Sequence, residues 1–250
     1  MPQTTHTPHP KDSNLILTFT EEDHKYVDTL GRVYTSGTAM VHSQFEQFDA
    51  AAAAKRVAAK QGTTPEAVIA KWNTKRDYAC NYGTRCHELA ESYLTSQQSG
   101  EFHQAQDERE LVSFETIRLA TRELAARFDL IACEKVLFSP DIKLAGTADL
   151  LMRARDGTVL LLDWKTNEAS KMSDDYFRMG RDLCAQVPDN ALSHYALQLS
   201  IYECMLRSEG HVEPDCKIVR ALVHVPPFST RPKWIPLSFM PQAQQLTHAK

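Results

Sequence analysis

Three charged residues interrupt two apolar stretches in the middle of the chain, and their types could do chemistry. Asp149 lies within KLAGTADLLMRA, and Asp163 and Lys165 lie within TVLLLDWKT. Two carboxylates that come close repel each other unless one takes up a proton or a cation lies between them. Oxygen ligands in a small cluster suit Mg²⁺ or Mn²⁺, which we therefore predict as the cofactor.

The short segment Arg155–Gly157 between the two stretches decides whether the two acids meet. A three-residue loop with glycine in the left-handed conformation is a common hairpin connection. With that loop Ala154 pairs with Thr158, and counting back places Asp149 directly opposite Asp163. A two-residue loop would shift the register by one and send Asp149 to the opposite face. The sequence is compatible with both loops.

The lysine adds a second chemical group to the acids. Side chains alternate along a strand, so Lys165 shares the face of Asp163, and Trp164 points toward the core. Such a lysine could hold an attacking water or stabilise a charged transition state, and a cation held by the acids would neutralise charge on a phosphate. The predicted chemistry is metal-assisted hydrolysis of a phosphodiester. The alternative is that these charges lie at strand ends and reach solvent.

The elements around these residues predict an α/β fold, with a central mixed sheet flanked by helices and a mainly helical N-terminal part that contains a hairpin. The predicted strands are Leu15–Thr20, two pieces within Lys25–Gly37, Ile131–Ser139, Lys143–Ala154, Thr158–Thr166, Lys217–Val225 and Trp234–Phe239. The predicted helices are Phe45–Lys60, Pro65–Arg76, one that opens at Gly83, Ala105–Phe128 and Ala191–Gly210.

We expect one domain over residues 14–240, with residues 14–130 mainly helical and residues 131–240 forming the catalytic sheet. Residues 1–13 and 241–250 are polar, so we predict a disordered arm and a loose tail. The sequence contains no run of about 18 apolar residues, so we expect no membrane span. The six cysteines form no CxxC pair, which favours reduced thiols over disulfides or a zinc site. These features are typical of a cytoplasmic protein.

The charge balance limits how the chain could hold nucleic acid. The formal net charge is −4, whereas a protein that binds nucleic acid by charge alone is usually basic. DNA binding would therefore need a metal ion or a local basic patch. Lys75, Arg76 and Arg85 are candidates for a DNA path along the N-terminal helices. The alternative for this basic run is a solvated helix face.

Two helical motifs complete a resemblance to a known family. GTADLLM and LLLDWKT resemble the strands of the PD-(D/E)XK nuclease superfamily, in which the first Asp and the D-x-K lie on neighbouring strands. YGTRCHELAE (Tyr82–Glu91) and YALQLSIY (Tyr195–Tyr202) are similar to the G-x-x-x-H and Q-x-x-x-Y helices of the RecB-like exonuclease branch. That branch includes mitochondrial genome maintenance exonucleases and phage and bacterial relatives. The resemblance covers roughly residues 26–225.

The resemblance implies roles for individual residues. His87, Asp149 and Asp163 would be metal ligands, and Lys165 would be the catalytic lysine. Gln198 and Tyr202 would help to position DNA or the lysine. The other residues with a supporting place near the site are Tyr195, Glu134 and Glu91. Of these, Glu134 occupies the first strand, where the family often has a Glu, and Glu91 either hydrogen-bonds His87 or is solvated.

The implied activity is that of a metal-dependent deoxyribonuclease, an exonuclease in DNA recombination, repair or replication in a bacterium or its phage. DNA, single strands included, would be the substrate, and a helicase or a single-strand binding protein is a candidate partner. Some relatives carry an iron–sulfur cluster, but this chain lacks the C-terminal cysteine cluster for it, so none is expected. The alternatives are a non-catalytic DNA-binding or adaptor protein and a hydrolase of another phosphoester or a structured RNA.

Overall fold

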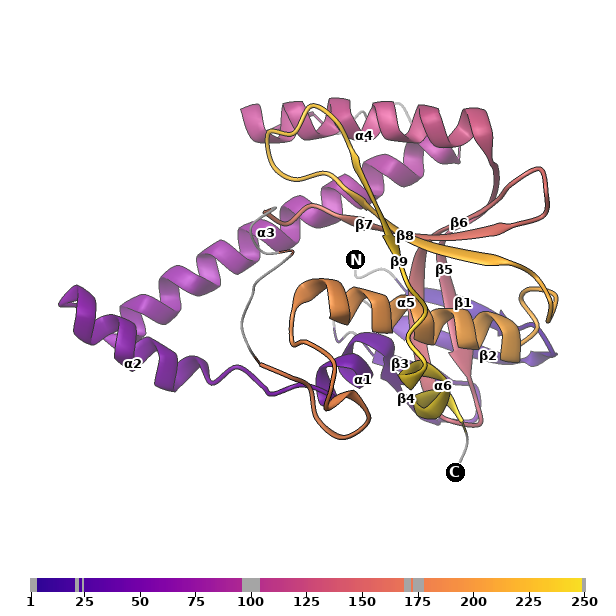
Figure 1. The fold of residues 1–250 in the computed structure, drawn as a ribbon, viewed down its shortest axis with the longest axis horizontal. Helices are drawn as coiled ribbons and strands as arrows, with labels where there is room; N and C mark the ends of the chain where they lie inside the picture. The colour runs from indigo at the N-terminus through magenta and orange to yellow at the C-terminus, as the bar shows by residue number, and fades with distance from the viewer. Residues whose placement is uncertain are drawn as a thin grey trace.

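A mixed β-sheet with helices against both faces forms the centre of the molecule (Figure 1). The computed structural model describes residues 4–20, 23, 25–95, 104–168, 172 and 178–248. Its strands are β1 (Thr4–His9), β2 (Asp12–Thr20), β3 (Lys25–Asp28), β4 (Val33–Ser36), β5 (Asp129–Ser139), β6 (Leu144–Arg153), β7 (Val159–Lys165), β8 (Ile218–His224) and β9 (Lys233–Leu237). They run in the order β1-β2-β3-β4-β6-β7-β8-β9, and β5 pairs with β6. The predicted α/β fold with a mixed sheet is confirmed.

The helices begin where the sequence supplies capping residues. Thr64 caps the first turn of α3 by accepting from Ala67 N, and Pro65 takes the first helical position. Asp107 and Asn190 cap α4 and α5 in the same way. The helices are α1 (Gly37–Ser43), α2 (Ala50–Gln61), α3 (Pro65–Leu94), α4 (Glu108–Arg127), α5 (Ala191–Ser208) and α6 (Gln242–Thr247), with a short 3₁₀ helix at Asp182–Cys184. Among the described residues, no helix combines the length and the apolar character needed to cross a membrane.

The hairpin between β6 and β7 has the three-residue loop that the sequence allowed. Arg153 pairs with Val159, and Ala154 N donates to Thr158 O over 2.8 Å. Gly157 has a φ of 85°, the left-handed conformation that such a loop needs. Continued along both strands, this register places Asp149 opposite Asp163, so the predicted register is confirmed and the two-residue loop is excluded.

The sheet divides along β6. The first residues of β6 pair in parallel with β4, and residues 150–153 pair with β7 in the antiparallel direction. Between these two pairings, residues 146–149 have no partner strand on that side among the described residues. On the other side β5 pairs along nearly the whole of β6. Asp149 therefore lies at a fork in the sheet, between the part of β6 that pairs with β4 and the part that pairs with β7.

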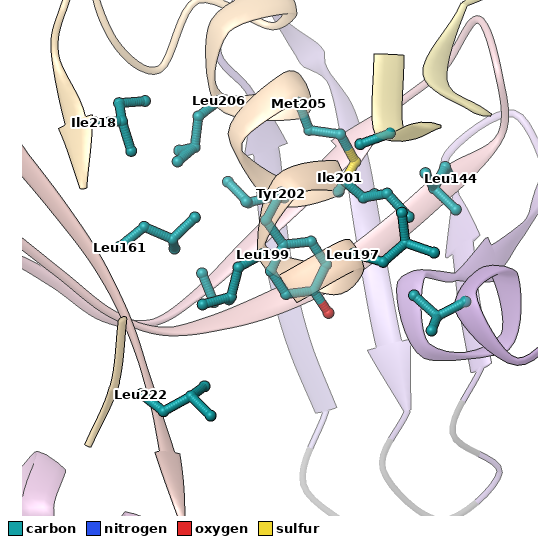
Figure 2. Close-up of a cluster of buried hydrophobic side chains, with 14 of the residues drawn as sticks. Leu144, Leu161, Leu197, Leu199, Ile201, Tyr202, Met205, Leu206, Ile218 and Leu222 are labelled. Carbon is teal, nitrogen blue, oxygen red and sulfur yellow. The ribbon is translucent and has the colours of Figure 1, made fainter. Parts of the chain in front are cut away.

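The fork is filled from one side by α5. Tyr202 is only 2% exposed and lies in the apolar cluster beneath α5, with its hydroxyl at the edge of that cluster (Figure 2). A Cβ atom on Gly146 would lie 2.6 Å from Cε1 of Tyr202, which is closer than real side chains approach. Glycine at 146 is therefore what allows the tyrosine ring to pack against β6.

Regular elements lie within both segments that the sequence predicted to be irregular. Within the predicted disordered arm over residues 1–13, Thr4–His9 forms β1 and pairs antiparallel with β2. His9 is buried and its Nε2 lies 3.1 Å from Oε2 of Glu209, which ties this hairpin to the end of α5. Within the predicted loose tail, residues 242–247 form α6, which buries Ala243.

The N-terminal helices also differ from the prediction. The two helices expected around Pro65 and Gly83 are one continuous helix, α3, and α1 was not predicted. Gly83 does not interrupt α3, because a single helical glycine costs only about 1 kcal/mol. Residues 73–81 of α3 are all exposed. Together α2 and the first half of α3 form an arm that projects from the sheet (Figure 1).

Candidate metal and phosphodiester site

Three side chains from three different elements meet beside the fork. His87 comes from α3, Glu134 from β5 and Asp149 from β6, and one ligand atom of each lies within 4.8 Å of the others. Nδ1 of His87 is 3.5 Å from Oδ2 of Asp149 and 3.7 Å from Oε1 of Glu134. An imidazole nitrogen and two carboxylate oxygens are a donor set that fits Mg²⁺, Mn²⁺ or another divalent cation.

The backbone of Trp164 orients two members of this group. Its N–H donates to Oδ2 of Asp149 over 2.9 Å, and its carbonyl accepts from Nε2 of His87 over 3.2 Å. A histidine whose Nε2 donates to a carbonyl presents Nδ1 as its free ligand atom, and here Nδ1 faces the carboxylates. The Trp164 side chain is buried among α3 and α4 residues, as predicted. The residue between the acid and the lysine therefore anchors the site through its backbone.

Glu134 reaches the group through an unusual backbone conformation. Cys133 pairs with Leu150 and Lys135 with Ala148, so the register of β5 with β6 brings Glu134 level with Asp149. Glu134 has a φ of 44°, which is in the left-handed region. A non-glycine residue in this region is strained, and such strain gathers at functional sites. The family resemblance implied only a supporting place for Glu134, whereas the structure puts it inside the group.

The charge on His87 depends on its acidic neighbours. Burial opposes its protonation, but the charge of Asp149 and a hydrogen bond with Glu134 outweigh burial and raise the pKa of His87 to about 9. The metal-free protein therefore holds an imidazolium between two carboxylates at neutral pH. A bound cation would take over the role of that proton.

Asp163 and Lys165 form a separate pair next to this group. Their side chains make an ion pair on one side of β7, as the strand alternation predicts. Asp163 is 3% exposed, and both burial and the Asp149 charge act to raise the pKa of its carboxyl. Burial lowers the pKa of Lys165, but Asp163 and Asp149 outweigh it, so the lysine stays protonated. Asp163 is thus held by the lysine, and its role as a metal ligand remains a prediction.

The predicted support from the Q-x-x-x-Y helix divides into two parts. Tyr195 supports the lysine, since Nζ of Lys165 lies 4.7 Å from the centre of its ring. Tyr202 instead belongs to the core, and its hydroxyl accepts from Nε2 of Gln198 over 3.0 Å. Gln198 also lies 3.3 Å from the Thr38 hydroxyl, next to α1. These contacts give the Gln198–Tyr202 pair a packing role at the fork.

A cleft of about 590 Å³ opens onto the metal group. Its walls come from β1, β2, α3, β5 and β6, and they include His87, Glu134 and Thr147. Glu91 also lines the cleft, where burial and the charge of Glu134 raise its pKa. The ring nitrogens of His87 contact Trp164, Asp149 and Glu134. Of the two alternatives for Glu91, this arrangement favours a side chain that does not hydrogen-bond His87.

The three basic residues of the predicted DNA path have different surroundings. Lys75 is exposed and lines a second cleft, which shares Ala79 with the cleft at the metal group. Arg76 is exposed and pairs with Asp77 over 2.8 Å. Arg85 is committed to the buried carboxylate of Glu110 at 2.9 Å, which argues against its predicted DNA contact. The sequence around Arg85 could not indicate this ion pair, because Glu110 lies 25 residues away in α4.

Comparison with known proteins agrees with this geometry. The model of one protein family, described as the PD-(D/E)XK nuclease superfamily, matches residues 36–245. None of the curated proteins compared with the chain gives a significant match. The matched residues include α3, β5, β6, β7 and α5, which supply every side chain of the site. Nucleases of this superfamily use divalent metals, and the group of His87, Glu134 and Asp149 is a candidate site for one. The chain belongs to the PD-(D/E)XK nuclease superfamily.

Proposed function

We propose that the protein is a Mg²⁺- or Mn²⁺-dependent deoxyribonuclease, with exonuclease activity favoured over endonuclease activity. The observation that carries the proposal is the group of His87, Glu134 and Asp149 beside the ion pair of Asp163 and Lys165. A donor set for a divalent cation next to a half-buried lysine is suited to phosphodiester hydrolysis. DNA recombination, repair or replication is the expected setting, in a bacterial or phage-infected cytoplasm.

Each residue has a proposed role. His87, Glu134 and Asp149 would hold the divalent cation, which when bound supplies Lewis-acid chemistry to a phosphate and to water. Trp164 keeps His87 and Asp149 oriented through its backbone. Asp163, released from its lysine or sharing it, would add a further oxygen ligand.

Lys165 has the role that depends most on its surroundings. It remains protonated because Asp163 and Asp149 outweigh its burial. Its ammonium group would therefore donate hydrogen bonds to the attacking water and to the non-bridging phosphate oxygens, where negative charge grows during attack. The ring of Tyr195 limits the positions that the ammonium can take.

The preference for an exonuclease rests on the motifs of the RecB-like branch, G-x-x-x-H at Gly83–His87 and Q-x-x-x-Y at Gln198–Tyr202. A time course with end-labelled linear DNA and with covalently closed circular DNA, in Mg²⁺, Mn²⁺ or EDTA, tests it. We expect metal-dependent loss of linear DNA only. Cutting of circles would make the protein an endonuclease, and absence of cleavage in every metal would contradict the proposal.

The second candidate is a non-catalytic DNA-binding or adaptor protein on the nuclease fold. The strained Glu134 and the intact set of His87, Asp149, Asp163 and Lys165 argue against a decayed site. The same samples separate the two functions, because an adaptor would shift labelled DNA in a gel without shortening it. A helicase or single-strand binding protein as partner belongs to either function and would be found by stimulation of cleavage or by co-purification.

A further inference from the structure

An aromatic residue on the exposed part of α3 is held in a fixed orientation without being buried. Tyr78 is 42% exposed, and its ring is parallel to that of Tyr82, with an interplanar angle of 3° and centroids 6.4 Å apart. Tyr82 is itself buried, and its hydroxyl donates a hydrogen bond to the Ser113 hydroxyl. The Tyr78 hydroxyl donates to Oδ2 of Asp107 over 2.7 Å, and the Arg109 guanidinium lies 5.2 Å from the Tyr78 ring centre. The ring is therefore preorganised, so a flat ligand would lose little side-chain entropy by binding it.

This ring is part of a cleft that leads to the catalytic strand. A cleft of about 550 Å³ is lined by Tyr78 and Arg109 on one side and by Thr166 and Asn167 on the other. Thr166 and Asn167 follow Lys165 directly in the chain. Ala79 lines both this cleft and the one at the metal group, so the two meet along α3. A chain molecule whose scissile bond lies at the metal group could thus extend toward Tyr78.

The charge around the ring suits a polyanion. Residues 50–80 contain six Lys or Arg and two Asp or Glu, whereas the whole chain has a net charge of −4. Lys71, Lys75 and Tyr78 are spaced four and three residues apart, so they share one side of α3. Lys75 lines the same cleft as Tyr78, and Glu168 lies in it as well. A phosphate is therefore expected on the Lys75 side of the ring.

We propose that Tyr78 is a stacking platform for an unpaired nucleobase of single-stranded DNA, with Lys75 contacting the adjacent phosphate. The inference rests on the proposed nuclease function and names the strand that the site selects. Every base offers a π-face, so stacking on an aromatic ring needs no particular sequence. A base inside a duplex has both faces covered by its neighbours and cannot stack on Tyr78. The platform therefore selects single strands or frayed ends.

Binding of two labelled oligonucleotides in EDTA, where cleavage is absent, tests the platform. One is a single strand of thymidines, and the other has the same length and abasic sites in place of the bases. Base stacking is worth about 1–3 kcal/mol by alanine substitution, so Tyr78→Ala should weaken binding of the thymidine strand by about 5- to 150-fold. It should leave binding of the abasic strand unchanged. Tyr78→Phe and Tyr78→Trp keep a ring and should retain most of the affinity.

The control variant is Phe228→Ala, which removes an aromatic side chain that is 60% exposed in the connection between β8 and β9. It should bind both oligonucleotides as the wild type does. Equal affinities of wild type and Tyr78→Ala for the thymidine strand would overturn the inference, and so would an equal loss for both strands. If the wild type still cleaves DNA in Mn²⁺, that result removes the platform alone. Absence of cleavage by the wild type would instead remove the proposed nuclease function.

Discussion

At the scale of single residues, the site depends on which charges are already neutralised by neighbours. The carboxylate of Asp163 forms an ion pair with Lys165. The His87 ring lies next to the carboxylates of Asp149 and Glu134. Two tightly spaced groups thus lie side by side, one suited to a cation and one that carries a cationic side chain. Substitutions of Lys165 and of Glu134 separate the contributions of the two groups to cleavage and to metal binding.

Lys165→Ala should reduce the cleavage rate by about 10²–10³-fold, the range found when one preorganised donor to a developing negative charge is removed. Binding of Mn²⁺ should survive, because His87, Glu134 and Asp149 remain. Single-turnover cleavage of end-labelled DNA, together with a calorimetric Mn²⁺ titration, measures both. Lys217→Ala is the matched control, since Lys217 is exposed next to the opposite end of β8. Wild-type cleavage by Lys165→Ala would remove the lysine from the mechanism.

Glu134→Gly and Glu134→Ala should differ in stability but agree in metal binding. Glycine adopts the φ of 44° without strain, so Glu134→Gly should be about 1 kcal/mol more stable than Glu134→Ala in urea unfolding. Both lose a carboxylate, so both should bind Mn²⁺ at least about tenfold more weakly than the wild type. Equal stabilities would show that position 134 is not strained, and unchanged Mn²⁺ affinity would exclude it as a ligand.

The sequence predicted most of these residues but not their arrangement. The alternation of side chains placed Asp163 and Lys165 together, whereas the register that aligns Asp149 was one of two that the sequence allowed, and only the structure decides between them. Glu134 had no comparable local signal, because its place in the group depends on a left-handed backbone and on pairing across β5 and β6. The ion pair of Arg85 with Glu110 had no local signal for a similar reason, since the two residues are 25 positions apart.

At the scale of elements, the fork in β6 creates the room for the site, and α5 holds the fork open. The ring of Tyr202 occupies the space over both Gly37 and Gly146. α5 is therefore more than a cover for the sheet, because its tyrosine packs between Gly37, which follows β4, and Gly146 of β6. A substitution that displaces the Tyr202 ring should therefore affect both the packing of α5 and the chemistry at Asp149.

Gly146→Ala tests this coupling. Its Cβ would meet Tyr202 at 2.6 Å, so the ring must move, and we expect a loss of about 1–3 kcal/mol in the free energy of unfolding. Adding Tyr202→Leu should recover part of that loss, as residues in contact do not act additively. Gly83→Ala is the control, because its Cβ would make only an ordinary 3.6 Å contact with Thr166. Additive losses in the double variant, measured by urea unfolding, would contradict the coupling.

The element pattern was predictable where burial follows a short sequence period. The strands β5 to β8 and the helices α4 and α5 lie close to their predicted ranges. The polar N-terminal strand β1 was missed because its order comes from pairing with β2 and from His9 buried against Glu209. No local pattern contains those partners.

At the scale of the whole molecule, the N-terminal hairpin closes onto the core at a cluster of ionisable groups. His211, just after α5, lies near Lys135, His9 and Glu209, and its Nε2 is buried with no hydrogen-bond partner among the described residues. Burial, supported by the positive charge of Lys135, lowers the pKa of His211 to about 4. Between pH 6.5 and about pH 4, this histidine is therefore mainly neutral in the folded protein and mainly protonated in the unfolded chain.

This difference predicts acid sensitivity. The unfolded chain binds a proton at His211 near its ordinary pKa of 6.5, so the folded state loses stability as the pH falls from 6.5 through about 4. The full loss amounts to roughly 2–3 kcal/mol. His211→Gln should lose correspondingly less stability than the wild type between pH 7 and pH 4 in urea unfolding. Parallel stability curves for the two proteins would show that His211 titrates normally in the folded state.

The most direct test of the whole account compares two aspartate variants, Asp149→Asn and Asp156→Asn, in one cleavage assay. Asp149 lies in the proposed metal group, whereas Asp156 is exposed in the β6–β7 turn and serves as the matched control. The rate of loss of end-labelled linear DNA is measured in Mn²⁺ and in EDTA. The account predicts metal-dependent cleavage by the wild type and Asp156→Asn, and at least a hundredfold slower cleavage by Asp149→Asn. Equal rates in all three proteins would show that cleavage does not depend on this group of residues.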